Sequence, residues 1–161
     1  MKDYFITIYE KCTLFWKNYF FQSFLAGLTI SIIFYVMSIE QAVIIASIGA
    51  SAFIVFAIPL SDAAKPQKLI GGHIVGLCAG FLCSLIPDTS FALNVFSYSL
   101  AVAGATFIMV TFDLEHPPAA GTALGVALLG FSLRASVILV ISVIVMALLH
   151  HFLKPYLKDL T

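Results

Sequence analysis

Long apolar segments separated by short polar ones dominate this sequence of 161 residues and restrict its fold class. An apolar helix of about 20 residues is long enough to cross the hydrocarbon core of a bilayer. Only 10% of the residues are charged, against about 25% in an ordinary soluble domain. With 61% hydrophobic residues, the chain has too few polar side chains to cover a globule in water. These features predict an all-α integral membrane protein of about six transmembrane helices, with apolar segments at 19–39, 42–60, 69–86, 91–112, 119–133 and 135–152.

Charge and cysteine content exclude several functional classes. Eight Lys and Arg balance eight Asp and Glu, so no overall basicity indicates a nucleic-acid partner. The three cysteines form no CxxC pair, which gives no reason to expect a metal site. A membrane enzyme would need paired catalytic groups, but Asp113 and Glu115 are separated by one residue and would not share a helix face. We therefore expect no enzyme, no metal and no cofactor.

The first residues differ from the apolar segments. They mix charged and aromatic side chains and lack the uninterrupted apolar run of a signal peptide. Helical spacing places one stripe of apolar side chains on a common face, formed by Phe5, Ile8, Tyr9, Cys12, Phe15, Trp16 and Tyr19. This pattern predicts an interfacial amphipathic helix over 1–18. A transmembrane domain over 19–153 and a short cytoplasmic tail over 154–161 complete the expected organisation.

The positions of Lys and Arg indicate the membrane topology, because these residues concentrate on the cytoplasmic side of short loops. If the short segment 119–133 crosses the membrane, seven lysines share one side and only Arg134 lies on the other. If the segment enters and returns, the division is six against two. The charges favour six crossings in a bacterial-type plasma (inner) membrane with both termini cytoplasmic, although full crossing by 119–133 stays open.

The segment 119–133 is too short to cross as a regular helix. Its fifteen residues span only ~22 Å as a helix, whereas the hydrocarbon core is ~30 Å thick. Pro117 and Pro118 disfavour helix in the residues before them. Non-helical backbone at membrane depth is tolerated only where it is buried in protein or lines a water-filled cavity. We therefore expect a hydrated functional site at this segment.

A helix that begins at Pro117 or Pro118 would offer an anion-binding site. Its first turn would present the unpaired amides of Ala119, Ala120 and Gly121 and the positive end of the helix dipole. The Thr122 hydroxyl follows one residue later, and the small side chains allow a ligand close to the backbone. The alternative is that these small residues only allow tight packing of helices in lipid.

Two histidines and one basic loop are further candidates. An ionisable side chain within the membrane indicates function, so His116 is a candidate to hydrogen-bond an anion or to carry a proton near neutral pH. The alternative is an ordinary helix-end histidine exposed at the interface. His73 either faces the same cavity or bonds a neighbouring backbone group. Lys65 and Lys68 either attract anions towards the cavity or only fix the orientation of the chain.

A second group of small residues at 46–52 includes Gly49, Ala50 and Ser51 and resembles the group at 119–125. If each half of the chain contains three crossings, the halves 19–86 and 91–152 form inverted repeats. Such repeats place a binding site at the middle of the membrane. A bundle without internal symmetry is the alternative.

Several motifs occur in an order that resembles the HPP family of integral membrane proteins. The His116–Pro117–Pro118 motif is followed by small residues through Leu124. The other motifs are Gly49–Ala50–Ser51–Ala52, Pro59–Leu60–Ser61, Lys65–Pro66–Gln67–Lys68 and Gly71–Gly72–His73. The resemblance covers about residues 40–135. Because relatives in photosynthetic lineages are associated with nitrite transport, it implies a small monovalent anion as the substrate.

Together, these observations predict a transporter or channel for a nitrite-like anion in the lipid bilayer. The expected substrate-binding residues are Gly49, Ala50, Ser51, Lys68, His73, His116, Pro117, Pro118, Ala119, Ala120, Gly121 and Thr122. The alternative is a non-transporting structural or regulatory membrane subunit. Faces rich in Gly and Ala are compatible with a homodimer.

Overall fold

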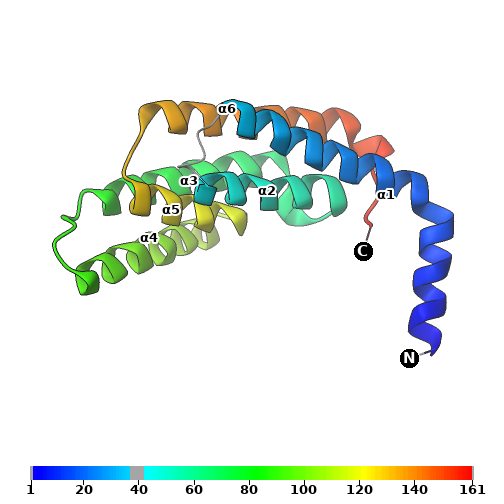
Figure 1. Cartoon of the computed structure of the whole chain (residues 1–161), viewed down its shortest axis with the longest axis horizontal. Coiled ribbons are helices and arrows are strands. Elements are labelled where there is room, and N and C mark those ends of the chain that lie inside the picture. The colour runs from blue at the N-terminus through cyan, green and yellow to red at the C-terminus, as the bar shows by residue number, and fades with distance from the viewer. Residues whose placement is uncertain (1, 37–41, 161) are drawn as a thin grey trace.

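The computed structural model describes the backbone of residues 2–36 and 42–160, and the side chains of 13–33, 35 and 42–160. Within these ranges the fold contains helices and no strands, as predicted. The described residues form six α-helices, which are α1 (Lys2–Val36), α2 (Ala42–Ala57), α3 (Pro66–Ser84), α4 (Phe91–Thr111), α5 (Pro118–Leu129) and α6 (Leu133–Leu153). Two 3₁₀ turns, η2 (Asp62–Ala64) and η3 (Lys154–Tyr156), accompany them. Figure 1 shows α2 to α6 running side by side as one bundle.

The helices follow the predicted apolar segments, but they differ in their capacity to cross a membrane. Among the described residues, α4 and the segment Leu133–Tyr156 are long and apolar enough to do so alone. Helices α2 and α5 are apolar but shorter. At 12 residues, α5 spans only ~18 Å, which confirms that the helix in this segment is short. Six crossings and inverted repeats stay predictions.

Helix α1 unites two segments that the sequence analysis separated at residue 18. It runs continuously from Lys2 to Val36, and Figure 1 shows its first part at a steep angle to the remainder. The side chains of residues 2–12, which carry much of the predicted amphipathic stripe, lie outside the described residues. The interfacial helix therefore stays a prediction, and residues 37–39 of the first apolar segment also lie outside the described residues.

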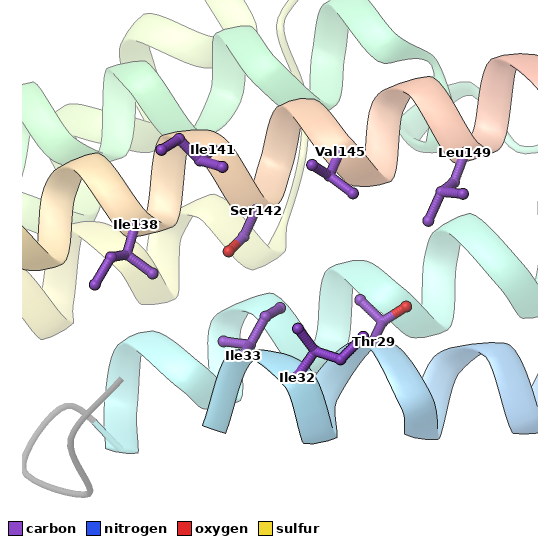
Figure 2. Close-up of a pocket in the computed structure, with 8 residues that line it drawn as sticks. All are labelled: Thr29, Ile32, Ile33, Ile138, Ile141, Ser142, Val145 and Leu149. Atoms are coloured by element: carbon purple, nitrogen blue, oxygen red, sulfur yellow. The ribbon is translucent and has the colours of Figure 1, made fainter. Parts of the chain in front are cut away.

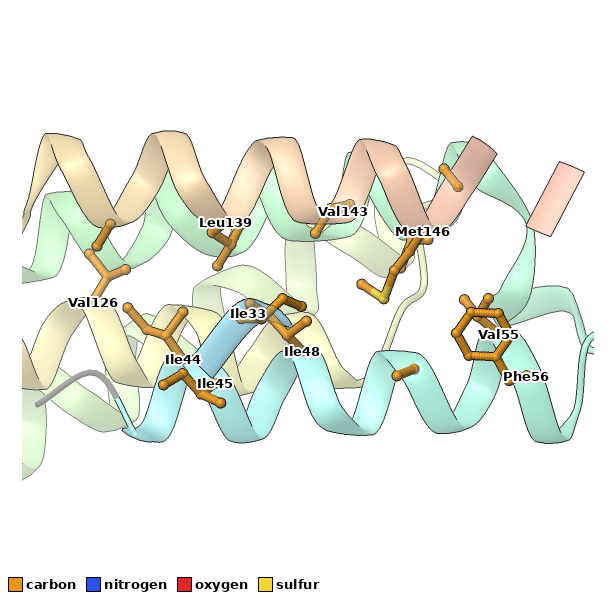
Figure 3. Packing of buried hydrophobic residues seen from close by; sticks show 14 of the residues in the cluster. Ile33, Ile44, Ile45, Ile48, Val55, Phe56, Val126, Leu139, Val143 and Met146 are labelled. Carbon is orange, nitrogen blue, oxygen red and sulfur yellow. The ribbon is translucent and has the colours of Figure 1, made fainter. Parts of the chain in front are cut away.

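The larger hydrophobic core joins α1, α2, α5 and α6. Its buried members include Ile48 from α2, Val126 from α5, and Leu139, Val143 and Met146 from α6 (Figure 3). In contrast, large side chains such as Phe107, Phe112 and Phe152 are exposed on the outside of the bundle. Since lipid tails are as apolar as these side chains, close packing rather than exclusion from water holds such helices together.

Glycines bring α3 and α5 into close contact. Gly72, Gly76 and Gly80 recur every four residues and therefore share one face of α3. A Cβ atom at Gly80 would lie 2.6 Å from the Ala123 carbonyl oxygen and 2.7 Å from the Val126 Cβ atom. The expectation that small residues allow tight helix packing is confirmed at this contact.

The residues after α6 return to the middle of α1 and the end of α2. The Gln22 side-chain amide donates to the Lys158 carbonyl at 2.8 Å, and the Leu160 amide donates to the Ala57 carbonyl at 2.8 Å. The Tyr19 hydroxyl donates to the Leu160 carbonyl at 3.1 Å. The predicted tail is therefore bound to the bundle in this structure.

Candidate functional site

The segment before α5 folds into a turn whose carbonyl oxygens accept hydrogen bonds from the first amides of the helix. The Ala119 amide donates to the His116 carbonyl at 2.8 Å, and the Ala120 amide donates to the Pro117 carbonyl at 3.1 Å. The expectation that these two amides are unpaired is therefore wrong. Pro117 has helical backbone angles, so the chain before Pro118 already curves enough to supply the two acceptor carbonyls.

Five polar side chains from separate parts of the chain meet in the interior. We call this group the polar cluster. All five are at most 5% exposed. The two imidazole rings have centroids 5.1 Å apart. The cluster is formed by Ser47 and Ser51 of α2, His73 of α3, His116 of the turn and Thr122 of α5.

Hydrogen bonds connect the polar cluster into a chain. Ser51 Oγ lies 2.8 Å from His116 Nε2 and 2.9 Å from His73 Nε2. His73 Nδ1 lies 2.8 Å from Thr122 Oγ1, which lies 2.9 Å from Ser47 Oγ.

Each end of this series of hydrogen bonds is a bond to a backbone carbonyl. The His116 Nδ1–H group donates to the Ala63 carbonyl at 2.8 Å, and the Ser47 hydroxyl donates to the Pro118 carbonyl. The chain thus joins η2, α2, α3 and α5.

Helical spacing decides which predicted residues of α2 reach the polar cluster. Ser47 and Ser51 are four residues apart and share a face. Gly49 instead faces Ile30 of α1, and Ala50 is exposed. The structure does not bring these two residues to the cluster. Ser47 was not predicted as a site residue, although its spacing of four residues from Ser51 is the signal that identifies it.

The remaining predicted residues near Pro118 form the frame of the polar cluster. Pro118 and Ala119 are buried, whereas Pro117 is exposed and Ala120 is partly exposed. A Cβ atom at Gly121 would lie 3.3 Å from the Ser47 Cβ atom. Glycine at this position therefore lets α2 and α5 approach closely enough for Ser47 and Thr122 to bond.

Lys68 lies in a charged group at one end of α3, outside the polar cluster. Its ammonium contacts Asp113 at 2.8 Å and Glu115 at 2.7 Å, and it also pairs with Asp62. Asp62 pairs with Lys65 as well. We call these five residues the acidic mouth, because three carboxylates surround two ammonium groups. Because the neighbouring acids pair with both ammonium groups, the structure gives no support to the alternative in which this loop attracts anions, and orientation of the chain stays the other alternative.

The acidic mouth stabilises its carboxylates in the charged form. Hydrogen bonds from Lys65 and then Lys68 lower the pKa of Asp62 to about 2. A hydrogen bond from Lys68 lowers the pKa of Asp113 below its ordinary value. Both carboxylates are exposed, Asp62 in η2 and Asp113 between α4 and α5, and their lowered pKa keeps them charged as partners of Lys68 at physiological pH.

The polar cluster is closed to solvent in this structure. Ser51, His116 and Thr122 are each 0% exposed. The predicted water-filled cavity is therefore not open, because the polar side chains fill the space by bonding to one another. His116 is not exposed at the interface, and His73 bonds side chains rather than backbone groups.

An apolar groove lies elsewhere, between α1 and α6. Its volume is about 250 Å³, and Figure 2 shows isoleucines from both helices along its walls. Its lining includes Ile32 and Ile33 of α1 and Ile138 and Ile141 of α6. It contains no member of the polar cluster. A small polar solute would find few hydrogen-bonding partners here.

An apolar exterior around a buried polar cluster is typical of a helical integral membrane protein. The model of the family described as HPP, transmembrane region, matches residues 11–155. The chain therefore belongs to the HPP transmembrane family.

Comparison with known proteins supports the membrane assignment. Two Dictyostelium discoideum proteins, each named a transmembrane protein, are 32% identical to this chain over 104 residues. The similar part is 63% of this chain but 36% and 33% of the relatives. The chain thus spans about a third of their length. No solved structure matches the chain.

Proposed function

We propose that this protein is a membrane transporter or channel for a small monovalent anion similar to nitrite. The observation that carries the proposal is the polar cluster itself. Ionisable and hydroxyl side chains inside a membrane bundle are costly and are typical of solute pathways. The cluster also lies at the His-Pro-Pro segment, from which the sequence resemblance implies anion transport.

The chemistry of the polar cluster suits a small anion. Imidazole N–H and hydroxyl groups can each donate a hydrogen bond to an anionic oxygen. The side chains of Ser51, His73, His116 and Thr122 point to one shared region from three helices and a turn. A nitrite ion that separated α2 from α5 would replace the bonds that these side chains now make to one another.

A carrier would open the closed cluster on each side of the membrane in turn, whereas a channel would open it to both sides together. Helix α5 is the element suited to move, since it is short and ends at Gly130, whose φ is 79°. A positive φ at glycine allows a sharp change of direction. In this proposal both termini are cytoplasmic, the chain crosses six times, and the structure represents a closed state between the two openings.

Uptake of nitrite into proteoliposomes tests the proposed function. We expect His116→Ala and Thr122→Val to reduce uptake about tenfold or more, because loss of ~1.4 kcal/mol of interaction changes a rate tenfold. The matched controls are His151→Ala, which removes an exposed histidine, and Ser97→Ala, which removes a buried hydroxyl outside the cluster. Both should retain the wild-type rate. Equal uptake by wild type and both cluster variants would contradict the proposed site.

A non-transporting membrane subunit is the second candidate. It is favoured by the complete pairing of the five cluster side chains and by the glycine contact between α3 and α5. In that case the cluster would only fix the packing of the helices. Wild-type protein that moves no anion above the rate of protein-free liposomes would support this candidate and reject transport.

A further inference from the structure

We propose that the polar cluster is a binding site for one exchangeable proton, which it takes up beyond the protons of its neutral side chains. The observation is the order of its hydrogen bonds. Both ends of the chain meet carbonyl oxygens, at Ala63 and Pro118. Carbonyl oxygens only accept hydrogen bonds. The terminal groups, His116 Nδ1 and Ser47 Oγ, must therefore both donate outwards.

When all five side chains are neutral, the polar cluster has one proton fewer than its hydrogen bonds require. Six contacts connect the Ala63 carbonyl to the Pro118 carbonyl through the five side chains. Each contact needs one hydrogen atom. A neutral imidazole and a hydroxyl group each supply one, so the five side chains supply five. One contact then joins two lone pairs, unless a proton is added.

One added proton completes all six contacts. With His116 as the cation, its Nε2–H group donates to Ser51, and donation continues through His73, Thr122 and Ser47 to the Pro118 carbonyl. With His73 as the cation, His73 donates to both Ser51 and Thr122, and Ser51 donates to His116. The Ser51 Oγ atom also lies 3.1 Å from the Ser47 carbonyl. This longer contact can only increase the demand for protons.

The two arrangements of the proton interconvert through Ser51. The N–H bond of His116 breaks while an O–H bond forms on Ser51, and the original O–H bond of Ser51 breaks while an N–H bond forms on His73. No electrons leave the chain. Because the two rings lie 5.1 Å apart in the interior, a second positive charge would be strongly repelled. The pair therefore holds one added proton rather than two.

The histidines are the groups of the polar cluster that can provide a positive charge for an anion, because the nearby lysines are paired with acids. Among the described side chains, the charged groups on η2, α3 and the turn around the polar cluster are Asp62, Lys65, Lys68, Asp113 and Glu115. Helices α2 and α5 contain none. Since Lys68 is neutralised by three carboxylates, an anion in the cluster lacks a lysine partner. An imidazolium would supply this charge, and the acids of the mouth lie near its bonded carbonyl at Ala63.

This consequence rests on the proposed function and makes it more specific, because it names the proton as the coupling ion. A single buried anion is costly in a membrane, whereas an anion paired with an imidazolium adds no net charge. One proton from bulk water would enter with each anion, form the imidazole N–H bond and leave with the anion on the other side. The proton site, in contrast, is argued from the hydrogen bonds of the polar cluster alone and does not depend on transport.

Nitrogen NMR of histidine in the bilayer-embedded protein tests the proton site directly. With ¹⁵N-labelled histidine, and His73→Gln and His116→Gln for assignment, we expect one imidazolium in this pair at mildly acidic pH. Ser47→Ala should abolish it, although Ser47 does not titrate. This variant removes two contacts and one proton, and its four remaining contacts are complete with four neutral groups. Ser97→Ala, which removes an unrelated buried hydroxyl, should retain the imidazolium.

Two results would overturn the proton site. One is a neutral His73–His116 pair in wild type at every pH where the protein stays folded. The other is an unchanged imidazolium in folded Ser47→Ala protein.

Proteoliposomes with a pH dye inside test the coupling separately. Proton entry with nitrite, above the background of protein-free liposomes and lost in Ser47→Ala, is the expected result. Nitrite entry without protons would overturn the coupling but leave transport intact. Absence of nitrite entry would reject the proposed function, while the NMR result would still decide the proton site.

Discussion

Replacement of Gly80 by alanine is expected to destabilise the bundle by about 1–3 kcal/mol, the usual effect of adding a methyl group to a closely packed interior. The new methyl group would lie 2.6 Å from the Ala123 carbonyl oxygen and 2.7 Å from the Val126 Cβ atom. One of these atoms belongs to the α5 backbone and the other is bonded directly to it, so neither can move aside as the end of a flexible side chain could. Thermal unfolding in detergent, followed by circular dichroism, measures the change.

Gly104 provides the matched control for this experiment. It also lies within a helix, but a Cβ atom there would have nothing within 4 Å. Gly104→Ala should therefore be neutral or stabilising, because alanine favours a helix by up to ~1 kcal/mol over glycine. Equal stability of the Gly80→Ala and wild-type proteins would show that α3 and α5 are not packed as closely as described.

Replacement of Ser51 by alanine is the second change with a large expected effect. The Ser51 hydroxyl lies between His73 Nε2 and His116 Nε2, so alanine leaves both nitrogens without this partner. A buried polar group without a partner costs about 1–3 kcal/mol. We expect a loss of stability in this range together with a loss of nitrite uptake, since the two imidazoles are no longer connected.

Ser97→Ala is the control for Ser51→Ala. Ser97 is also buried, but its hydroxyl donates to a backbone carbonyl, that of Cys83 in α3, at 2.8 Å, and lies outside the polar cluster. Its removal should cost less and leave uptake intact, because both histidines keep their partners. Comparable losses from both serine variants would indicate that the Ser51 bonds have no special importance.

Local patterns in the sequence explain how much of the fold could be predicted. The apolar segments 42–60, 91–112 and 135–152 correspond to α2, α4 and α6, because a membrane helix must be apolar along its length. Proline marks the first residue of both α3 and α5, at Pro66 and Pro118. Its fixed φ angle and missing amide suit the first turn of a helix.

Contacts between distant segments explain what could not be predicted at the site. The sequence indicated His116, His73, Ser51 and Thr122 individually. The partner of His116 Nδ1, however, is a backbone carbonyl at Ala63, and no side-chain pattern identifies such an acceptor. The pairing of Lys68 with Asp113 and Glu115 across more than 40 residues was likewise not visible in the sequence.

The closed state of the polar cluster also results from contacts between segments that are distant in the sequence, and it could not be predicted for the same reason. Span length predicted irregular backbone before α5, but both water and side chains can satisfy polar groups at that depth. In the structure side chains do so. The central claim is therefore that this closed cluster opens to water during transport.

Access of a water-soluble thiol reagent to cysteine at position 51 tests that claim most directly. Ser51→Cys would be made with Cys12, Cys78 and Cys83 replaced by alanine, and the protein would be kept in liposomes. If the cluster opens as proposed, the introduced thiol reacts with the reagent and nitrite slows the reaction. A thiol that stays unreactive in folded, membrane-embedded protein, while a cysteine at exposed Ser132 reacts, would contradict the proposed pathway.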